Sequence, residues 1–531
     1  MRSLSPLSLI LLFVLFPGCG PGGVKPTHTG GEVAADGKTA TDGKTKDAAP
    51  TASSDDVLTS AIHQLRPENF GINSATDKPV SLLNSWRYKR AETQATTEQP
   101  IPVKVPSGWI TAEEEVRLSQ SKFDAIDAQH IRDAMFHRVI SGYLSDRGQT
   151  ELQKVAVIVD FVCRNVALWK DDDVELPLQP YMIMQIGLGS ADDRAWVCAE
   201  IFRQIRIDCV VLRTKSDVKA TSDNWLLGVI LEGKIYLFDM RLGLPIARGD
   251  ETSRDSVASL AEVVEHPEWL QQMAVKETYR VSSDDLREAT VYVMSDLEFW
   301  CRRMSDLEQV LPPSDLCVLY DPLSDEESRP GLLQRVTKAG GWPVESLQLW
   351  SHPRRQADEL RKTAEAKQQE WKRLTIPFSV PIPVKYEDNG KPIIGVPERK
   401  FQRYRSDQLL GKFAEATARY LRIRHLEVEQ NPADLEVINR MASEDAFYWT
   451  SLCKFEMGEY TTAVELLTDY IKKYDRKGKW FYPARTLLAQ SHAELGQFTE
   501  AIAVFERTSS DDPYRASNTL RIKRWTAAKS K

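Results

Sequence analysis

Residues 187–239 read GLGSADDRAWVCAEIFRQIRIDCVVLRTKSDVKATSDNWLLGVILEGKIYLFD. After the two glycines at its start, apolar residues recur at helical spacing and then form a continuous run. A second apolar run covers residues 225–231, and a third ends at Asp239 after the turn Glu232-Gly233. This pattern predicts one helix followed by strands that pair through a tight turn, which places the chain in the α+β class.

This segment resembles the active-site half of a transglutaminase-like domain, a family of the papain-like superfamily. In that family a Cys begins a core helix in a motif close to G-x-C-x-D-x-A. A His then opens a strand in an H-x-W motif, and an Asp or Asn ends the next strand. Gly189, Asp193 and Ala195 match the helix motif, and Trp225 and Asp239 match the strand positions. The resemblance implies a core of helices packed on an antiparallel sheet.

Two of the three catalytic positions of that family hold other residues here. Ala191 occupies the nucleophile position and Asp223 the His position. Acyl transfer by this route needs a thiolate at a helix N-terminus and an imidazole that moves the proton. Alanine has no nucleophile, and a carboxylate in the His position would raise the pKa of a neighbouring thiol. We therefore expect a degenerate triad without catalytic residues, in which Asp239 holds a loop at the end of a strand.

A shifted nucleophile is the alternative that keeps an activity. Cys198 follows Ala191 by seven residues on the same helix, which places it roughly 10 Å deeper, where a buried apolar role is more typical. Cys209 lies in an apolar strand pattern. Ser190 adjoins the nucleophile position, but it lacks an evident base and suits a helix N-cap.

The other cysteines show no metal-binding pattern. None forms a C-x-x-C motif and none lies beside a His at ligand spacing, so neither a metal nor a cofactor is expected. Their pairing stays open. The six cysteines beyond the N-terminal segment are Cys163, Cys198, Cys209, Cys301, Cys317 and Cys453.

The N-terminus carries a secretion signal. Arg2 supplies a positive charge, and residues 7–16 form an apolar stretch that is too short to span a bilayer as a stable helix. The sequence Leu15-Phe16-Pro17-Gly18-Cys19 resembles a bacterial lipoprotein lipobox, which implies that Cys19 becomes the lipidated first residue. Because bacterial lipoproteins without an Asp after this Cys are typical of the outer membrane, we expect the protein to be lipid-anchored at its periplasmic face.

Composition is that of a globular chain of several domains. Its 531 residues are 42% hydrophobic and 27% charged, with a net charge of −7, which argues against a nucleic-acid partner. The expected segments are a signal peptide (1–19), a disordered tether (20–54), an N-terminal helical lead-in (55–119), the transglutaminase-like domain (120–250), an α+β extension (251–374), a proline-rich linker (375–399) and helical repeats (400–525).

Apolar spacing also predicts individual elements. The expected helices cover residues 57–65, 80–87, 119–143, 150–169, 256–265, 267–273, 294–310 and 354–373, and the expected short strands cover residues 279–281, 291–293 and 316–320.

The C-terminal part contains an internal repeat. Gly458, Tyr460 and Ala463 recur as Gly496, Phe498 and Ala501, an offset of 38 residues. This pattern resembles tetratricopeptide-type repeats, in which a Gly marks the turn of a helix pair and a small Ala lies where the helices touch. The usual unit is about 34 residues, and an insertion at 477–480 accounts for the excess. A weaker echo comprises Gly411, Phe413 and Ala416.

Three functions fit these patterns. The first is a membrane-anchored, non-catalytic binding or scaffolding lipoprotein whose degenerate domain and repeats hold a peptide or protein partner. The second is an active cysteine-type protease or acyltransferase that acts on envelope peptides through a shifted nucleophile. The third is a purely structural lipoprotein whose tether positions an assembly.

Overall fold

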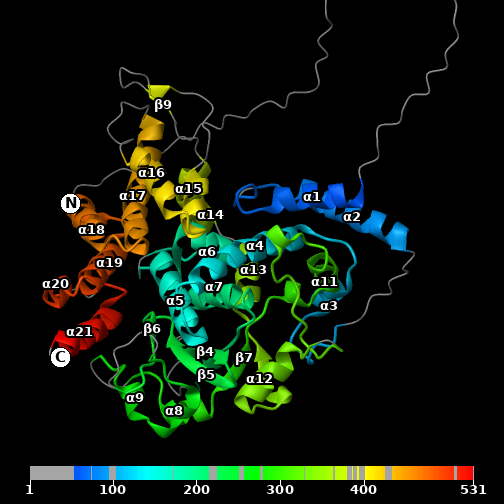
Figure 1. Ribbon diagram of the computed structural model, residues 1–531, viewed down its shortest axis with the longest axis horizontal. Coiled ribbons are helices and arrows are strands. Elements are labelled where there is room, and N and C mark those ends of the chain that lie inside the picture. The colour runs from blue at the N-terminus through cyan, green and yellow to red at the C-terminus, as the bar shows by residue number, and fades with distance from the viewer. Residues whose placement is uncertain are drawn as a thin grey trace, which may run out of the picture. The chain divides into compact units, whose positions relative to one another are not determined.

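A six-stranded mixed sheet is flanked by helices on both faces (Figure 1). Its strands are β3 (Asp208–Arg213), β4 (Trp225–Leu231), β5 (Lys234–Asp239), β6 (Leu244–Pro245), β7 (Thr290–Val293) and β8 (Leu347–Leu349), in the order β6-β5-β4-β3-β7-β8. The expectation of an antiparallel sheet holds from β6 to β7, but β8 runs parallel to β7. The sheet is therefore mixed, and two of its strands come from beyond residue 250.

The computed structural model describes the chain from residue 53 onward. The described residues are 53–72, 74–94, 103–170, 173–214, 224–249, 256–275, 279–327, 329–362, 365–379, 385–386, 392–393, 401–424, 433–506 and 511–529. The expected signal peptide, Cys19 and nearly all of the expected tether lie outside these residues, as does Asp223. Among the described residues, no helix combines the length and the apolar character needed to cross a bilayer.

Most of the helices before the sheet start at a side-chain cap. They are α1 (Ser54–Leu65), α2 (Asp77–Gln94), α3 (Ala112–Ser119), α4 (Ala125–Ser145), α5 (Glu151–Asn165), α6 (Pro180–Ile186) and α7 (Ala191–Arg203), with the short parallel strands β1 (Ala167–Leu168) and β2 (Leu188–Gly189) between them. Asp124 and Thr150 each close a capping box at the start of α4 and α5, because their side chains accept from the backbone two or three residues on. These caps set the starts of two helices that apolar spacing alone places too early, at residues 119 and 150.

The two faces of the sheet bury different side chains. Val211 and Leu227 belong to a core shared with α4, α5, α6 and α7, whereas Val210 and Leu226 belong to a second core on the opposite face. The alternation is the ordinary consequence of pleating. Because both faces are covered, β3 and β4 are apolar almost throughout, which is why the sequence shows them as continuous runs.

The segment after β6 differs most from expectation. Its elements are α8 (Leu260–Glu265), α9 (Glu268–Gln271), α10 (Ser283–Arg287), η1 (Leu297–Trp300), α11 (Arg302–Glu308), η2 (Pro313–Asp315), α12 (Leu332–Gly340), η3 (Val344–Ser346), α13 (His352–Arg361) and α14 (Glu365–Ser379). The expected helix over 294–310 is split into η1 and α11, and residues 279–281 and 316–320 form no strand. The proline-rich linker expected from residue 375 begins inside α14, and the short pair β9 (Lys385–Tyr386) and β10 (Pro392–Ile393) follows.

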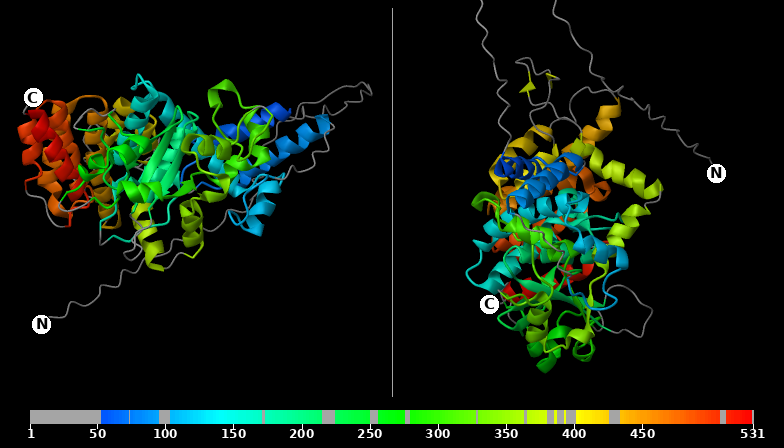
Figure 2. Two further views of the ribbon diagram at one scale, coloured as in Figure 1. Left: turned by 90° about the horizontal axis from the view of Figure 1, so that it is seen from below. Right: turned by 90° about the vertical axis from the view of Figure 1, so that its right-hand side faces the viewer.

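The C-terminal helices are coloured from yellow-orange to red in Figure 2. Along the chain they form three successive hairpins and a final helix. They are α15 (Phe401–Leu409), α16 (Phe413–Ile423), α17 (Ala433–Glu456), α18 (Tyr460–Tyr474), η5 (Asp475–Lys477), α19 (Phe481–Glu494), α20 (Phe498–Ala503) and α21 (Arg515–Lys529). Each packs on the next along the chain. Gly411, Gly458 and Gly496 occupy the three hairpin turns with φ of 81°, 77° and 73°, a conformation that suits glycine. The weak echo at Gly411 thus marks a turn of the same kind.

Candidate functional site

The N-terminus of α7, where the nucleophile of a transglutaminase-like enzyme would lie, is closed by a capping box. The Ser190 hydroxyl accepts from the Asp193 backbone N–H at 3.1 Å, and the Asp193 carboxylate accepts from the Ser190 N–H at 2.8 Å. Ala191 is the first residue of the helix. The hydroxyl of Ser190 therefore serves as the N-cap, and the adjoining position carries only a methyl group.

A histidine that the sequence pattern does not reveal lies beside this cap. The Nε2 atom of His352, the first residue of α13, is 2.8 Å from a carboxylate oxygen of Asp193. The imidazole is buried and stacks on Trp350, with ring centroids 5.0 Å apart. A His–carboxylate pair thus lies at the N-terminus of α7. His352 and Asp193 are 159 residues apart along the chain, so no local motif reveals the pair.

Asp239, at the end of β5, is fully occupied by donors from its own neighbourhood. Its buried carboxylate accepts from the backbone N–H groups of Arg241 and Leu242 at 3.0 Å each. It also accepts from the Tyr279 hydroxyl at 2.5 Å and from the Arg280 guanidinium at 2.8 Å. Burial and the charge of Asp239 raise the pKa of Tyr279 well above its usual value. Because four donors use this carboxylate, it fixes the turn after β5 and does not orient an imidazole.

Arg194 connects the start of α7 with the end of β5. It lies one turn into α7 and is 1% exposed. Its Nε donates to the Val166 carbonyl at 2.8 Å, and its Nη1 donates to the Met240 carbonyl at 3.2 Å. The helix that begins at Ala191 is thereby tied to the strand end at Asp239 through a guanidinium group and not through a reacting pair.

The thiols of the described chain are poor nucleophiles. All six are free, and all except the half-buried Cys163 are buried. Burial raises the pKa of Cys198 well above its usual value and that of Cys209 to about 12, and the Cys209 thiol donates to the Met294 sulfur at 3.6 Å. Neither shifted-nucleophile candidate has the thiolate character that acyl transfer requires.

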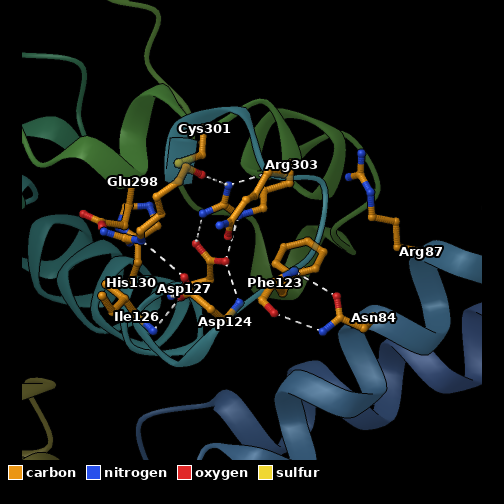
Figure 3. Close-up of polar contacts among 12 residues, drawn as sticks. Asn84, Arg87, Phe123, Asp124, Ile126, Asp127, His130, Glu298, Cys301 and Arg303 are labelled. Carbon is orange, nitrogen blue, oxygen red and sulfur yellow. Dashed lines mark hydrogen bonds and ion pairs between the residues drawn. The ribbon is translucent and has the colours of Figure 1, made fainter. Parts of the chain in front are cut away.

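Buried charge networks, which apolar spacing could not locate, join α4 to the segment around α11. Arg303 faces Asp127 across this contact (Figure 3) and donates to its two carboxylate oxygens at 2.8 Å each, with both side chains fully buried. The Nη1 atom of Arg303 also donates to the Arg117 carbonyl. A bidentate pair of this kind is rigid, so it stabilises the packing of these helices.

A cluster of carboxyl groups lies close to that network. Burial and the charge of Glu298 raise the pKa of Asp296 to about 8, although the Trp196 indole N–H donates to its carboxylate at 3.2 Å. Burial raises the pKa of Glu200 well above its usual value, and Asp296 adds to this effect. Burial acts to raise the pKa of Glu298, but Arg117, His130 and hydrogen bonds together lower it below its usual value. The sequence signal for this cluster is a set of acidic residues inside otherwise apolar runs.

A buried arginine is one of the contacts through which the repeat hairpins dock on the core. Arg405 of α15 donates from Nη1 to the Asn165 side-chain oxygen at 3.1 Å, and from Nη2 to the Asn165 and Met184 carbonyls at 3.1 and 2.9 Å. These carbonyls belong to the last turns of α5 and α6. A cation is favoured at such helix C-termini, so Arg405 satisfies both ends at once.

The insertion at residues 477–480 also contributes to the contact between the repeat hairpins and the core. Trp480, which is 1% exposed, donates its indole N–H to Asp445 at 2.7 Å. A Cβ atom on Gly187 would lie 3.1 Å from the Trp480 ring, and Gly187 ends α6 with φ of 75°. Glycine is therefore required at this close approach. The first helices of the hairpins, α15, α17 and α19, thus turn their apolar faces to the core, while α18 and α20 keep much of their surface exposed.

Comparison with known families supports the repeats. Residues 436–508, most of the span from α17 to α20, match the family model described as "Anaphase-promoting complex, cyclosome, subunit 3", whose members carry tetratricopeptide-like repeats. The match confirms the prediction of such repeats and covers less than half of the chain. Repeats of this kind generally mediate contacts between proteins. No curated protein and no solved structure is significantly similar to the chain.

Proposed function

We propose that the protein is a non-catalytic binding or scaffolding lipoprotein of the bacterial envelope. Its core is a degenerate transglutaminase-like domain, and its tetratricopeptide-like repeats help to hold a peptide or protein partner. A fold of this kind persists without chemistry because the packing of helices on a sheet does not depend on the triad.

The observation that carries this proposal is the state of the triad positions. Ala191 offers no nucleophile, and Asp239 is saturated by the Arg241 and Leu242 backbone, Tyr279 and Arg280. Limiting alkylation of the native full chain tests the proposal, because an acyl-transfer thiolate reacts near neutral pH and a buried thiol does not. A reactive Cys198 or Cys209 would favour the cysteine-type protease or acyltransferase instead.

The surface that is open to a partner is decided by how the repeat hairpins pack on the core. In an isolated repeat array the first helices of the hairpins line the concave surface, but here α15, α17 and α19 pack on the core. We therefore assign partner binding to the surfaces that the repeats and the core form together, and to the outer helices α18 and α20, which stay partly exposed.

The membrane attachment is part of the same proposal and rests on the lipobox that ends at Cys19. Acylation adds about 0.8 kcal/mol of membrane affinity for each buried methylene, so several acyl chains hold a protein firmly. The variant Cys19→Ser is expected to leave the outer-membrane fraction on separation of envelope membranes, while wild type stays in it. Equal membrane association of both proteins would contradict the anchor.

A further inference from the structure

A cleft runs between the core and the last repeat. Its larger cavity, of about 290 Å³, lies between α5, the turn into β6, the end of α19 and α21. A smaller cavity of about 30 Å³ adjoins it and reaches Arg194 and Tyr514. The two cavities share Asp160, Arg164, Gly243, Gln490 and Arg521, and together they form the repeat–core cleft.

Three arginines at this cleft lack an acidic partner. Arg521 is 9% exposed and donates only from Nη1, to the Ser517 hydroxyl at 3.0 Å and the Asn518 side chain at 3.3 Å. Arg524 donates to the Pro245 carbonyl at 3.4 Å, and Arg194 donates to backbone carbonyls. Within the described ranges, none of the three forms an ion pair with a carboxylate.

The acidic groups nearby do not balance this charge. Asp160 acts on both Arg521 and Arg524, and it forms an ion pair with Arg164, at 3.9 Å. Arg164 in turn is held by Glu456 at 2.8 Å. Glu494 also lines the larger cavity, at the end of α19. Burial lowers the pKa of Arg521 to about 10, as expected for a guanidinium removed from water without a counter-ion.

Part of the wall of the larger cavity is apolar. Phe238, Leu244 and Phe498 line the larger cavity together with Trp525. The Trp525 ring stacks on Phe505, with ring centroids 6.0 Å apart and planes 6° from parallel, so it presents a fixed face. The cavity volume lies at the lower end for small-ligand pockets, which suits one or two residues of a peptide.

We infer that the repeat–core cleft binds the carboxylate of an acidic peptide segment, with Arg521 and Arg524 as its charged contacts and the apolar wall as the seat of a neighbouring side chain. A guanidinium group binds a carboxylate through two parallel hydrogen bonds, and the free Nε and Nη2 atoms of Arg521 supply such a pair. The inference rests on the proposed function, since it names the partner's chemistry.

The probe is a pool of N-acetylated tripeptides that end in free Asp or Glu, with every residue type at the middle position. The full chain is incubated with this pool and with a matched pool ending in Asn or Gln amides, and bound peptides are identified by mass spectrometry. The acidic pool is expected to be enriched, above all in members with an aliphatic or aromatic middle residue. The amide pool is expected to be retained at least tenfold less.

Variants assign the binding to the cleft. Arg524→Gln and Arg521→Gln are each expected to weaken binding of the best tripeptide at least tenfold by calorimetry. Arg515→Gln, on the exposed side of α21, is the matched control and is expected to leave the affinity unchanged. Arg524 is only partly buried, so its variant tests the site even if Arg521→Gln is unstable.

Three results would overturn the inference. The first is that wild type retains no more of the acidic pool than the double variant Arg521→Gln/Arg524→Gln does, and the second is that wild type retains the amide pool as well as the acidic pool. The third is that inorganic phosphate binds as tightly as the best tripeptide. The last would make the cleft a site for small anions. None of these results bears on the thiol test of the proposed function at Cys198 and Cys209, because neither of these cysteines lines the cleft, whereas Cys163 does.

Discussion

At the scale of single residues, the positions that the transglutaminase resemblance assigns to a triad are held in structural contacts. Asp239 keeps its place at the end of β5 but holds a turn, and Arg194 takes up the carbonyls that lie between that strand and α7. The Ser190 and Asp193 pair caps the helix that would otherwise activate a thiol. The polar residues at these positions therefore serve capping and packing.

The carboxyl group of Asp296 is expected to make stability depend on pH. Its pKa is raised to about 8 in the folded protein, so its protonation stabilises the fold fully below about pH 4, and this contribution is lost as the pH rises through about 8. Asp296→Asn removes the titration and keeps an oxygen for the Trp196 indole. In urea unfolding, the free energy of unfolding of the variant is expected to rise relative to that of wild type by up to about 4 kcal/mol between pH 5 and pH 9.

Asp284→Asn is the control for this prediction, because the Asp284 side chain is 85% exposed. It is expected to leave the pH dependence of the free energy of unfolding unchanged. If Asp296→Asn and wild type kept a constant difference from pH 5 to pH 9, the carboxyl group would not be held protonated by the fold.

At the scale of elements, the sequence predicts the helices and strands whose apolar residues follow a regular pattern. α4 and α5 follow from apolar spacing, and β3, β4 and β5 follow from their apolar runs and the Glu232-Gly233 turn. α6 gives no amphipathic signal, because all seven of its residues are buried. The apolar run at 316–320 has strand character but finds no pairing partner, and such pairing is decided by distant residues.

Docking between elements is beyond the reach of local patterns. Arg405 contacts Asn165, which is 240 residues away along the chain, and His352 contacts Asp193, which is 159 residues away. The repeat motif predicts hairpins at Gly458 and Gly496 but not the face that they bury. The insertion before Trp480 was visible as an excess of length, and its role became clear only from its contact with Gly187.

The substitution Arg405→Met tests the docking of α15 on α5 and α6. It leaves the Asn165 and Met184 carbonyls without their donor in a buried contact, and it is expected to cost about 3–5 kcal/mol of the free energy of unfolding. Arg403→Met, two residues earlier, removes a hydrogen bond to the Glu68 carbonyl and is expected to cost about 1 kcal/mol. Equal losses for the two variants in urea unfolding would show that Arg405 does not secure the docking.

At the scale of the whole molecule, residues 52–531 form one compact unit in which the repeats and the sheet share a hydrophobic core. The repeats are therefore an integral wall of the protein and not a separate arm. We propose that a partner meets the outer helices α18 and α20 and the repeat–core cleft, and that the core supports both surfaces.

The most direct test of this account is the reactivity of the six cysteines in the native full chain. The protein is treated with a limiting alkylating agent from pH 6 to pH 9, with a urea-unfolded sample as the control, and the adducts are located by mass spectrometry. Because burial raises the pKa of all six thiols, we predict that none reacts at pH 7 faster than a free thiol with a pKa of about 8.5, whereas all six react after unfolding. Rapid alkylation of native Cys198 or Cys209 below pH 7 would contradict the account and identify a cysteine nucleophile.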